Sequence, residues 1–515
     1  MYIVNINDNN GSETISISKT MRLDKLMKEL DLMLDMPCSG NHTCGKCKVT
    51  VKGHLSEMTD EERMLLKDEE IKNNIRLACF AEVNGDIEIF LDQTEANVLS
   101  MVKQGDLEFT EEGYGISVDI GTTTVAMQLY ELRTGKLLGE DLRNNAQCIF
   151  GADVISRIKY ATENGTKYLQ DSIHKQLLDM SKECMHKAEI YEINKSVVTG
   201  NTVMLHFYEG LETRSIAVAP FKTESLFGRN GDFELSGSQT YLPSCIGSYV
   251  GADISCSILA AGMQRHNDRI ELLADLGTNG ELVLNYRGEM YCASTAAGPA
   301  FEGANLSHGM RAELGAISEM MVDDGKVLFK VIGNGKPKGV CGSGVLDAVS
   351  VMLELGVINE TGRIDEDYDG DGEVVKYQDE PAWKIPSTEV YITQKDIRQI
   401  QLAKSAIFAG IKTLLDQAGL KEKDIETFYV AGGFGYHMNG ENAANIGLFP
   451  RGLERCMEVI GNGALSGAIM LLFDNKQKEY IKEIINKSTE VDLSGKQVFS
   501  DYYIEGMLFE EDEKY

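Results

Sequence analysis

Four cysteines near the start of the chain have types and spacing that could bind iron. Cys38 is followed after five residues by Cys44 and after two more by Cys47, and Cys79 comes after 31 further residues. Three thiolates from one loop and a fourth from a distant segment can enclose a flat two-iron cluster, and Gly40 would let backbone amides approach its sulfides. The pattern therefore predicts a [2Fe-2S] cluster held by these four cysteines.

A structural zinc site is the alternative use of these cysteines. Zinc sites usually combine two close pairs, whereas only Cys44 and Cys47 are close here. His42 lies inside the same loop and raises the further alternative of a mixed cysteine and histidine cluster. Because all four cysteines are present, we favour the all-cysteine cluster and interpret His42 as a solvated loop residue.

The elements around the cysteines suit a small β-grasp domain. Residues 2–6 and 14–17 have the pattern of paired strands, residues 23–34 have helical periodicity, and residues 87–91 form a closing strand. The segment PCSGNHTCGKCKVTV resembles the plant-type and vertebrate-type [2Fe-2S] ferredoxins, although its first gap is five residues where the plant pattern has four. We therefore predict a ferredoxin-like domain over residues 1–91.

A second kind of chemistry is indicated further along the chain, after a polar, acidic stretch that predicts a linker over residues 92–113. The segment ISVDIGTTTVAMQLYEL places Asp119 just before a turn made by Gly121, Thr122 and Thr123. Amides and hydroxyls of such a turn can hold phosphate oxygens, and the aspartate can hold hydrated Mg²⁺. An ordinary glycine turn between two strands is the alternative.

The same pattern recurs in ELLADLGTNGELVLNY, which indicates an internal duplication. Asp275 takes the place of Asp119, and Glu281 at the end of the repeat is the candidate for activating a hydrolytic water. The turn of the repeat supplies the candidate phosphate contacts Gly277, Thr278, Asn279 and Gly280.

A third glycine cluster follows a strand-like run in TFYVAGGFGYHM. The three turns, in this order, resemble the superfamily of actin, hexokinase and the heat-shock chaperone ATPases, in which two related α/β halves close over ATP. The resemblance implies that Asp119 and Asp275 face the metal and that Gly432, Gly433 and Phe434 contact adenosine. We expect the two halves to span residues 114–270 and 271–515.

Three helices supply further candidates. The QLAK segment resembles the chaperone helix that contacts adenine, which makes Gln401 and Lys404 candidate nucleotide contacts; the alternative is the solvated face of an amphipathic helix. Small residues in GALSGAIMLLF suit a close helix crossing between the halves, and plain core packing is the alternative. The start of another apolar helix could offer amides to an anion through Gly342, Ser343 and Gly344.

Composition excludes several classes of function. A formal net charge of −30 over 515 residues opposes general binding to nucleic acid or to anionic lipid. The N-terminus has no signal-peptide pattern, and the longest apolar run, residues 464–473, is too short to cross a bilayer. Eleven cysteines, an odd number, argue against a disulfide framework, so we expect a cytoplasmic protein in a reducing compartment.

The combination of both domains resembles one family, the reductive activators of corrinoid proteins. The resemblance rests on CSGNHTCGKC, VDIGTTT, NAQCIFGADVISRI, VTGNTVMLH, ADLGTNGE, GPAFEGANLSHGM, CGSG and AGGFG, and a small domain that some members carry after the linker is reduced or missing here. It implies that the protein reduces the Co(II) form of a corrinoid protein to Co(I), through the cluster and at the expense of ATP. It also implies an external low-potential electron donor.

Other functions stay open at this point. A small-molecule kinase with a regulatory ferredoxin domain would transfer phosphate, and an ATP-binding redox sensor would bind nucleotide without partner-stimulated hydrolysis. An activator of a dehydratase or ring reductase would carry its cluster on cysteines inside the actin-like fold, where the cysteines of this chain are scattered singly. The oligomeric state is also open, with a homodimer among the alternatives.

Overall fold

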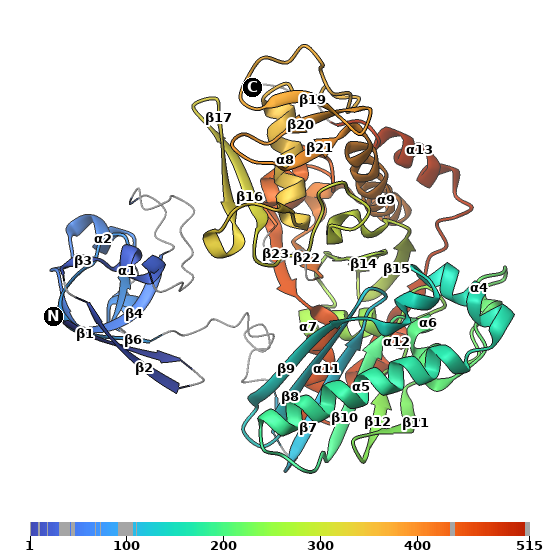
Figure 1. Ribbon diagram of the computed structural model, residues 1–515. Coiled ribbons are helices and arrows are strands. Elements are labelled where there is room, and N and C mark those ends of the chain that lie inside the picture. Colours follow the sequence, from blue (N-terminus) through green and yellow to red (C-terminus); the bar gives the residue numbers. More distant parts are fainter. Residues whose placement is uncertain are drawn as a thin grey trace. The chain divides into compact units, whose positions relative to one another are not determined.

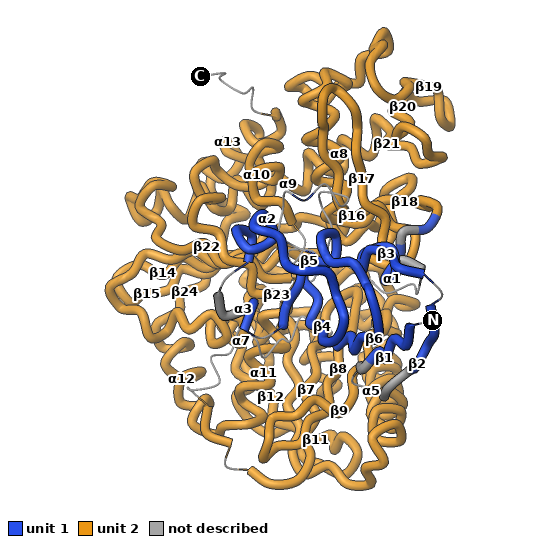
Figure 2. Tube along the Cα trace, turned by 90° about the vertical axis from the view of Figure 1, so that its left-hand side faces the viewer, with its two compact units in different colours: residues 1–97, 333–335 blue, residues 98–332, 336–515 orange. Residues whose placement is uncertain are grey.

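The computed structural model describes residues 2–8, 11–17, 19–29, 42, 47–66, 68–72, 74–90, 107–109, 111–432 and 438–509. The chain divides into two compact units (Figure 2): one comprises residues 1–97 with 333–335, and the other comprises residues 98–332 and 336–515. The hydrophobic core of the first unit is separate from the cores of the second. Each unit is therefore described by itself.

The smaller unit is built on a mixed sheet with the strand order β2-β1-β6-β4-β5, in which β3 also pairs with β6. The first strand, β1 (Tyr2–Asp8), is antiparallel to β2 (Gly11–Ile17) and parallel to β6 (Glu82–Phe90). Alternate side chains such as Val4 and Ile89 are buried, as the period of a half-covered strand requires. This is the predicted β-grasp. Its other elements are β3 (Met21–Arg22), α1 (Leu23–Glu29), β4 (Lys48–Leu55), α2 (Asp60–Met64), α3 (Asp68–Lys72) and β5 (Ile75–Leu77).

The predicted linker of residues 92–113 lies largely outside the described residues. Its last part is packed on the larger unit, which the sequence did not indicate. Leu107 is buried, and the Phe109 ring lies 5.0 Å from the ring of Phe473. Two apolar side chains thus hold the end of this segment.

Among the described residues, the larger unit contains two six-stranded sheets that share a five-stranded arrangement, besides two three-stranded sheets (Figure 1). In each, three consecutive strands form an antiparallel meander, a later strand pairs in parallel with the first of them, and another later strand pairs in parallel with that one. The sixth strand pairs with the outer parallel strand in the first sheet and with the last meander strand in the second. This repeat confirms the duplication predicted from the two hairpins. The first sheet consists of β7 (Tyr114–Ile120), β8 (Thr124–Glu131), β9 (Lys136–Asn144), β10 (Lys195–Gly200), β11 (Arg229–Leu235) and β12 (Ser238–Leu242). The second consists of β13 (Glu271–Leu276), β14 (Gly280–Tyr286), β15 (Glu289–Thr295), β22 (Thr427–Ala431), β23 (Met457–Gly461) and β24 (Ser488–Glu490).

Helices cover both faces of each sheet (Figure 1). The outer face of the first sheet packs on α5 (Lys167–Lys187), and the outer face of the second packs on α9 (Gln394–Ala418). Between the sheets lie α7 (Ala252–Ala261) and α11 (Gly463–Phe473), whose side chains share one core with strands of both halves.

The crossing of α7 and α11 depends on a glycine. A Cβ at Gly467 would lie 2.1 Å from the Cys256 carbonyl oxygen, so only glycine permits this approach. The sequence-based prediction of a close helix crossing between the halves is confirmed, and the alternative of plain core packing does not explain a backbone contact of this kind.

The larger unit also contains further helices, and further strands that lie outside these two sheets. Within the described residues no helix is both long and apolar enough to cross a membrane. The other helices are α4 (Val154–Asn164), α6 (Thr202–Glu209), α8 (Gly342–Glu354), α10 (Gly440–Asn445), α12 (Gln477–Lys487) and α13 (Gln497–Glu505). The other strands are β16 (Ala316–Asp323), β17 (Lys326–Val331), β18 (Gly339–Val340), β19 (Glu373–Tyr377), β20 (Glu380–Lys384) and β21 (Tyr391–Thr393).

Candidate active site

The two predicted phosphate-binding hairpins meet in the larger unit. The Thr123 hydroxyl lies 3.0 Å from the Thr278 hydroxyl, which itself donates to the Glu302 carboxylate at 2.8 Å. Since the Thr278 proton is used for Glu302, Thr123 is the donor of the first bond. The β7–β8 turn of one half and the β13–β14 turn of the other are therefore in direct contact through side chains.

Acidic residues gather beside these turns. Asp119 lies near the end of β7 and Asp275 near the end of β13, where strand register places Asp275 directly opposite Glu281 of β14. Asp253, in the first turn of α7, belongs to the same group. The charges of Asp119 and Asp275 are near enough to raise its pKa. The structure thus brings together the three predicted catalytic carboxylates and a fourth that the sequence analysis missed.

No local pattern in the sequence marks Asp253. It is the second residue of α7, whose N-cap is Gly251, and the matching residue of α11, whose N-cap is Asn462, is Ala464.

Burial of several carboxylates close together raises their pKa values. Burial is the main cause for Asp119, whose pKa rises to about 6, while burial and the Asp119 charge raise the pKa of Asp275 to about 7. Burial and then the charges of Asp119 and Asp275 raise the pKa of Asp253 to about 8. Burial also raises the pKa of Glu281 well above its usual value. Among the residues that the structure describes, no three of these carboxylates converge closely enough to hold a metal ion by themselves.

Bonds between the halves hold two of these carboxylates. The Asn462 side chain, at the N-terminus of α11, donates to Asp119 at 3.0 Å, and the Ser257 hydroxyl of α7 donates to Asp275 at 3.3 Å. Each half therefore supplies the hydrogen-bond donor for the aspartate of the other half.

Gly432 follows β22 beside the second hairpin. Its φ is +103°, and a Cβ there would lie 2.5 Å from the Leu276 carbonyl oxygen and 3.3 Å from an oxygen of Asp275. Only glycine suits this position. Gly433 and Phe434, the other predicted adenosine contacts, lie outside the described residues.

The structure gives Gln401 and Lys404 a role other than the predicted nucleotide contact. Lys404 is fully buried, and its ammonium donates to the carbonyls of Gly506 and Leu508 at 2.6 and 2.7 Å. Gln401 donates to the Met507 carbonyl at 2.6 Å. Both side chains therefore fasten the segment after α13 to α9, and the alternative of a solvated helix face is also wrong for them.

The start of α8 is buried against β16. Ser343 donates to the Ser318 carbonyl at 2.8 Å, and a Cβ at Gly344 would lie 2.1 Å from the Ile317 carbonyl oxygen. Gly342 is buried as well. Packing against β16 explains why the residues at the start of α8 are small. Their role in anion binding stays a prediction.

In the smaller unit, two of the predicted cluster ligands lie together. The Cys47 and Cys79 sulfurs are both buried and 3.3 Å apart, too far for a disulfide of about 2.05 Å and close enough to share one metal ion. Cys38 and Cys44 lie outside the described residues. The thiol pair fits a cluster-binding role.

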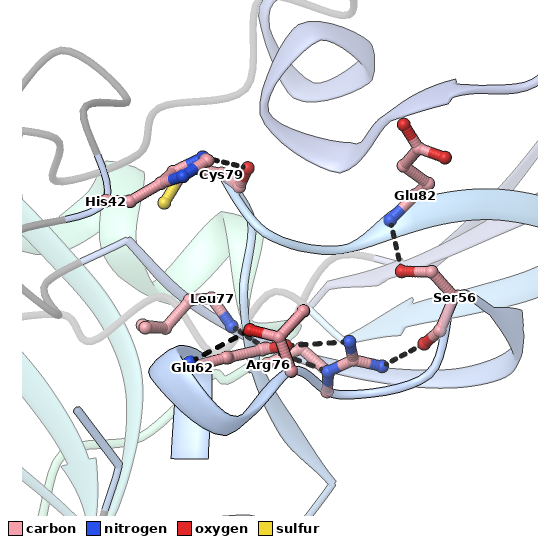
Figure 3. Close-up of polar contacts among 8 residues, drawn as sticks. His42, Ser56, Glu62, Arg76, Leu77, Cys79 and Glu82 are labelled. Atoms are coloured by element: carbon pink, nitrogen blue, oxygen red, sulfur yellow. Dashed lines mark hydrogen bonds and ion pairs between the residues drawn. The ribbon is translucent and has the colours of Figure 1, made fainter. Parts of the chain in front are cut away.

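Polar contacts fix the turn that carries Cys79, directly after β5 (Figure 3). The His42 Nε2 donates to the Cys79 carbonyl at 2.9 Å, so this nitrogen is used by the backbone. Two residues earlier, Leu77 donates its amide to the fully buried Glu62, which also forms a two-bond ion pair with Arg76. A buried bidentate pair of this kind fixes the backbone that leads to the cysteine.

Comparisons with known sequence families cover nearly the whole chain. Residues 6–84 match the 2Fe-2S iron-sulfur cluster binding domain, residues 114–266 match the RACo middle region, and residues 269–515 match the C-terminal domain of RACo, described as the ASKHA domain.

Individual relatives agree with these matches. The corrinoid activation enzyme RamQ of Eubacterium limosum is 34% identical over 424 residues, which cover 77% of this chain and 70% of that protein. The Co(II) methylated amine-specific corrinoid protein reductase of Methanosarcina barkeri is 26% identical, with 76% of each chain covered. A solved structure of a reductive activator for corrinoid, iron-sulfur protein superposes with a TM-score of 0.73 at 26% identity and covers 99% of this chain and 98% of the other.

Proposed function

Because this chain belongs to the family of reductive activators of corrinoid proteins, we propose that it passes one electron to the Co(II) form of a corrinoid protein and couples this transfer to ATP hydrolysis. The observation that carries the proposal is the pairing, in one chain, of two adjacent buried thiols with a duplicated hairpin site rich in carboxylates. The relatives favour this reading over a small-molecule kinase or a redox sensor.

The energy requirement explains why ATP is used. A bound [2Fe-2S] cluster would supply single electrons at a potential near −400 mV, the range of plant-type ferredoxins. If the Co(II)/Co(I) couple lies about 100 mV lower, the transfer is uphill by roughly 2.3 kcal/mol. Nucleotide binding and hydrolysis can supply a free energy of this size.

We assign the phosphates to the two hairpins. The Thr122 and Thr123 hydroxyls, with the amides of their turn, would hold phosphate oxygens from one side, and Thr278 would do so from the other. Asp119 and Asp275 would orient the waters of Mg²⁺, which keeps several of its waters and commonly binds through one or two carboxylates and the phosphates.

For activation of the hydrolytic water we prefer Asp253 to the predicted Glu281. A general base works best when its pKa lies near the operating pH, and the pKa of Asp253 is raised to about 8. Burial and then the charges of Asp253 and Asp275 raise the pKa of Glu281 well above its usual value, so Glu281 is the second candidate.

Coupling of electron transfer to ATP hydrolysis requires that the two halves of the larger unit respond to the nucleotide. A nucleotide can shift a conformational equilibrium only by its different affinity for the two states. The bonds from Asn462 to Asp119 and from Thr123 to Thr278 join the halves at the phosphate site, so they are the contacts that ATP and ADP would alter differently.

The remaining partners are proposals of the same kind. We propose an external low-potential donor that reduces the cluster, and a reducing cytoplasmic setting in which free thiols persist. A homodimer and the predicted boundary at residue 270 stay predictions.

Anaerobic visible spectroscopy tests the proposal. The chain is mixed with a purified Co(II) corrinoid protein, a low-potential reductant and Mg-ATP, and a parallel sample omits ATP. We expect a Co(I) band that requires ATP and is lost in the Asp275→Asn and Cys79→Ser variants. Absence of Co(I) with several corrinoid partners, despite an intact cluster and bound nucleotide, would contradict the proposal.

A further inference from the structure

One conspicuous sequence motif, NAQCIFGADVISRI, is not used by any step above. It runs from the residue after β9 into the start of α4, and it lies behind the first hairpin. The Asn145 side chain donates to the Gly121 carbonyl at 2.8 Å, and the Asn145 amide donates to the Thr123 carbonyl at 2.9 Å. The Arg157 guanidinium donates to the Thr122 carbonyl at 2.6 Å.

Three consecutive carbonyls of the hairpin are thus held from one side. In a planar trans peptide the C=O and the following N–H point in opposite directions. The amides of Thr122, Thr123 and Thr124 are therefore turned away from the motif and toward the opposite side of the turn. Successive amides that face one side of a turn can form an anion-binding concavity.

Both donors are themselves fixed. Asn145 is 1% exposed, and its side-chain oxygen accepts from the Gln147 amide at 2.9 Å. Arg157 is fully buried and also donates to the Gly151 carbonyl at 2.9 Å and to the Cys148 sulfur at 3.2 Å. The buried guanidinium additionally places a positive charge behind the turn, where water screens it poorly.

The second hairpin is supported differently. Its Thr278 carbonyl accepts from the backbone amide of Gly298 at 2.8 Å. A backbone donor brings no charge, so the two hairpins differ in how strongly they attract an anion.

We propose that Asn145 and Arg157 are positioning residues for ATP: they aim the amides of the first hairpin at the phosphates without touching the nucleotide. The inference rests on the proposed function, because it presumes that this hairpin binds ATP. Their effect should be specific for phosphate, since the resemblance assigns adenosine to Gly432 and the residues after it, away from the first hairpin.

The test uses the full-length protein with its cluster and three variants. Asn145→Asp keeps the acceptor for Gln147 but loses the donor to Gly121. Arg157→Met removes both charge and donors, and Arg157→Lys restores the charge. Arg143→Met is the control, because Arg143 is a partly exposed arginine of β9 that pairs with Asp141.

Calorimetric titration compares the non-hydrolysable analogue Mg-AMPPNP with adenosine for each protein. We expect Asn145→Asp and Arg157→Met to weaken AMPPNP binding about tenfold, the size of typical outer-shell effects. Adenosine binding should stay within about twofold, as it should for the control. Arg157→Lys should recover part of the loss.

The outcomes separate this inference from the proposed function. If the wild-type protein binds no AMPPNP, the proposed function fails first. If the wild type binds but both variants bind AMPPNP normally, the positioning role is wrong. Equal losses for AMPPNP and adenosine would also overturn it, because they would indicate general disruption of the fold. If the Arg157 variants do not fold, Asn145→Ser, which is too short to reach the Gly121 carbonyl and adds no negative charge, decides the question.

Discussion

Asn462 and Asp119 are 343 positions apart in the chain, yet the Asn462 amide nitrogen lies 3.0 Å from an oxygen of the Asp119 carboxylate. The same asparagine caps α11 by accepting from the Leu465 amide at 2.7 Å. One side chain therefore starts the helix that crosses between the halves and also fixes the aspartate of the opposite half. Helix geometry and the phosphate site are thus coupled directly.

Replacement of this asparagine should separate the two roles. Asn462→Ser keeps a good cap but is too short to reach Asp119, so we expect ATPase activity to fall severalfold with little loss of stability, since serine and asparagine cap about equally well. ATPase assays and thermal unfolding measure the two effects. Asn439→Ser is the control, because Asn439 caps α10 through bonds to its own helix. Equal activity in both variants would contradict the coupling.

The helix crossing predicts a strong effect of one methyl group. Gly467→Ala places a Cβ against the Cys256 carbonyl and should force α7 and α11 apart, at a cost of about 1–3 kcal/mol. Thermal unfolding of the variant should show a lower midpoint. Gly495→Ala is the matched control, since a Cβ there meets nothing within 4 Å. A Gly467→Ala protein as stable as the control would show that the helices can separate freely.

The raised pKa of Asp253 predicts that stability depends on pH. Its pKa of about 8 in the folded protein exceeds the value of about 3.9 in the unfolded chain, so the folded state binds more protons between these values. Stability of the nucleotide-free protein should therefore fall as the pH rises from 5.5 to 8, by up to about 1.4 kcal/mol per pH unit from this group.

Denaturant unfolding at several pH values measures this slope. Asp253→Asn should flatten it, and Mg-ATP should stabilise the wild type more at pH 8 than at pH 5.5. Asp492→Asn is the control, because the Ser494 hydroxyl and amide lower the pKa of Asp492 and keep it ionised over this range. An unchanged slope in Asp253→Asn would show that this carboxylate does not hold a proton.

The C-terminal contacts predict that Lys404 acts on stability and not on nucleotide binding. Lys404→Met should loosen the segment after α13 and increase its cleavage in limited proteolysis, while ATP affinity stays within about twofold. Lys395→Met, an exposed position on the same helix, serves as the control. A selective loss of ATP affinity in Lys404→Met would restore the role inferred from the chaperone resemblance.

Local residue patterns in the sequence were enough to predict both domain types and several candidate site residues of this protein. Cysteine spacing predicted the cluster domain, because ligand geometry constrains the distances between thiols along the chain. The Asp-x-Gly-Thr repeat predicted a duplicated fold and identified Asp119 and Asp275 as candidate site residues, since a turn that binds phosphate needs small residues and a nearby acid. The small residues of α11 predicted a crossing at Gly467.

Only the tertiary structure decided which distant residues act together. Asp253 joined the acidic group through burial beside Asp119 and Asp275, a property that no local pattern encodes. Lys404 had the sequence context of a nucleotide contact, but the fold covers it with the chain's own C-terminal segment. The role of Arg157 also depends on burial, because a guanidinium acts on the Thr122 carbonyl only when packing places it there. Motifs report local chemistry, whereas long-range packing determines where each group points and how well water screens its charge.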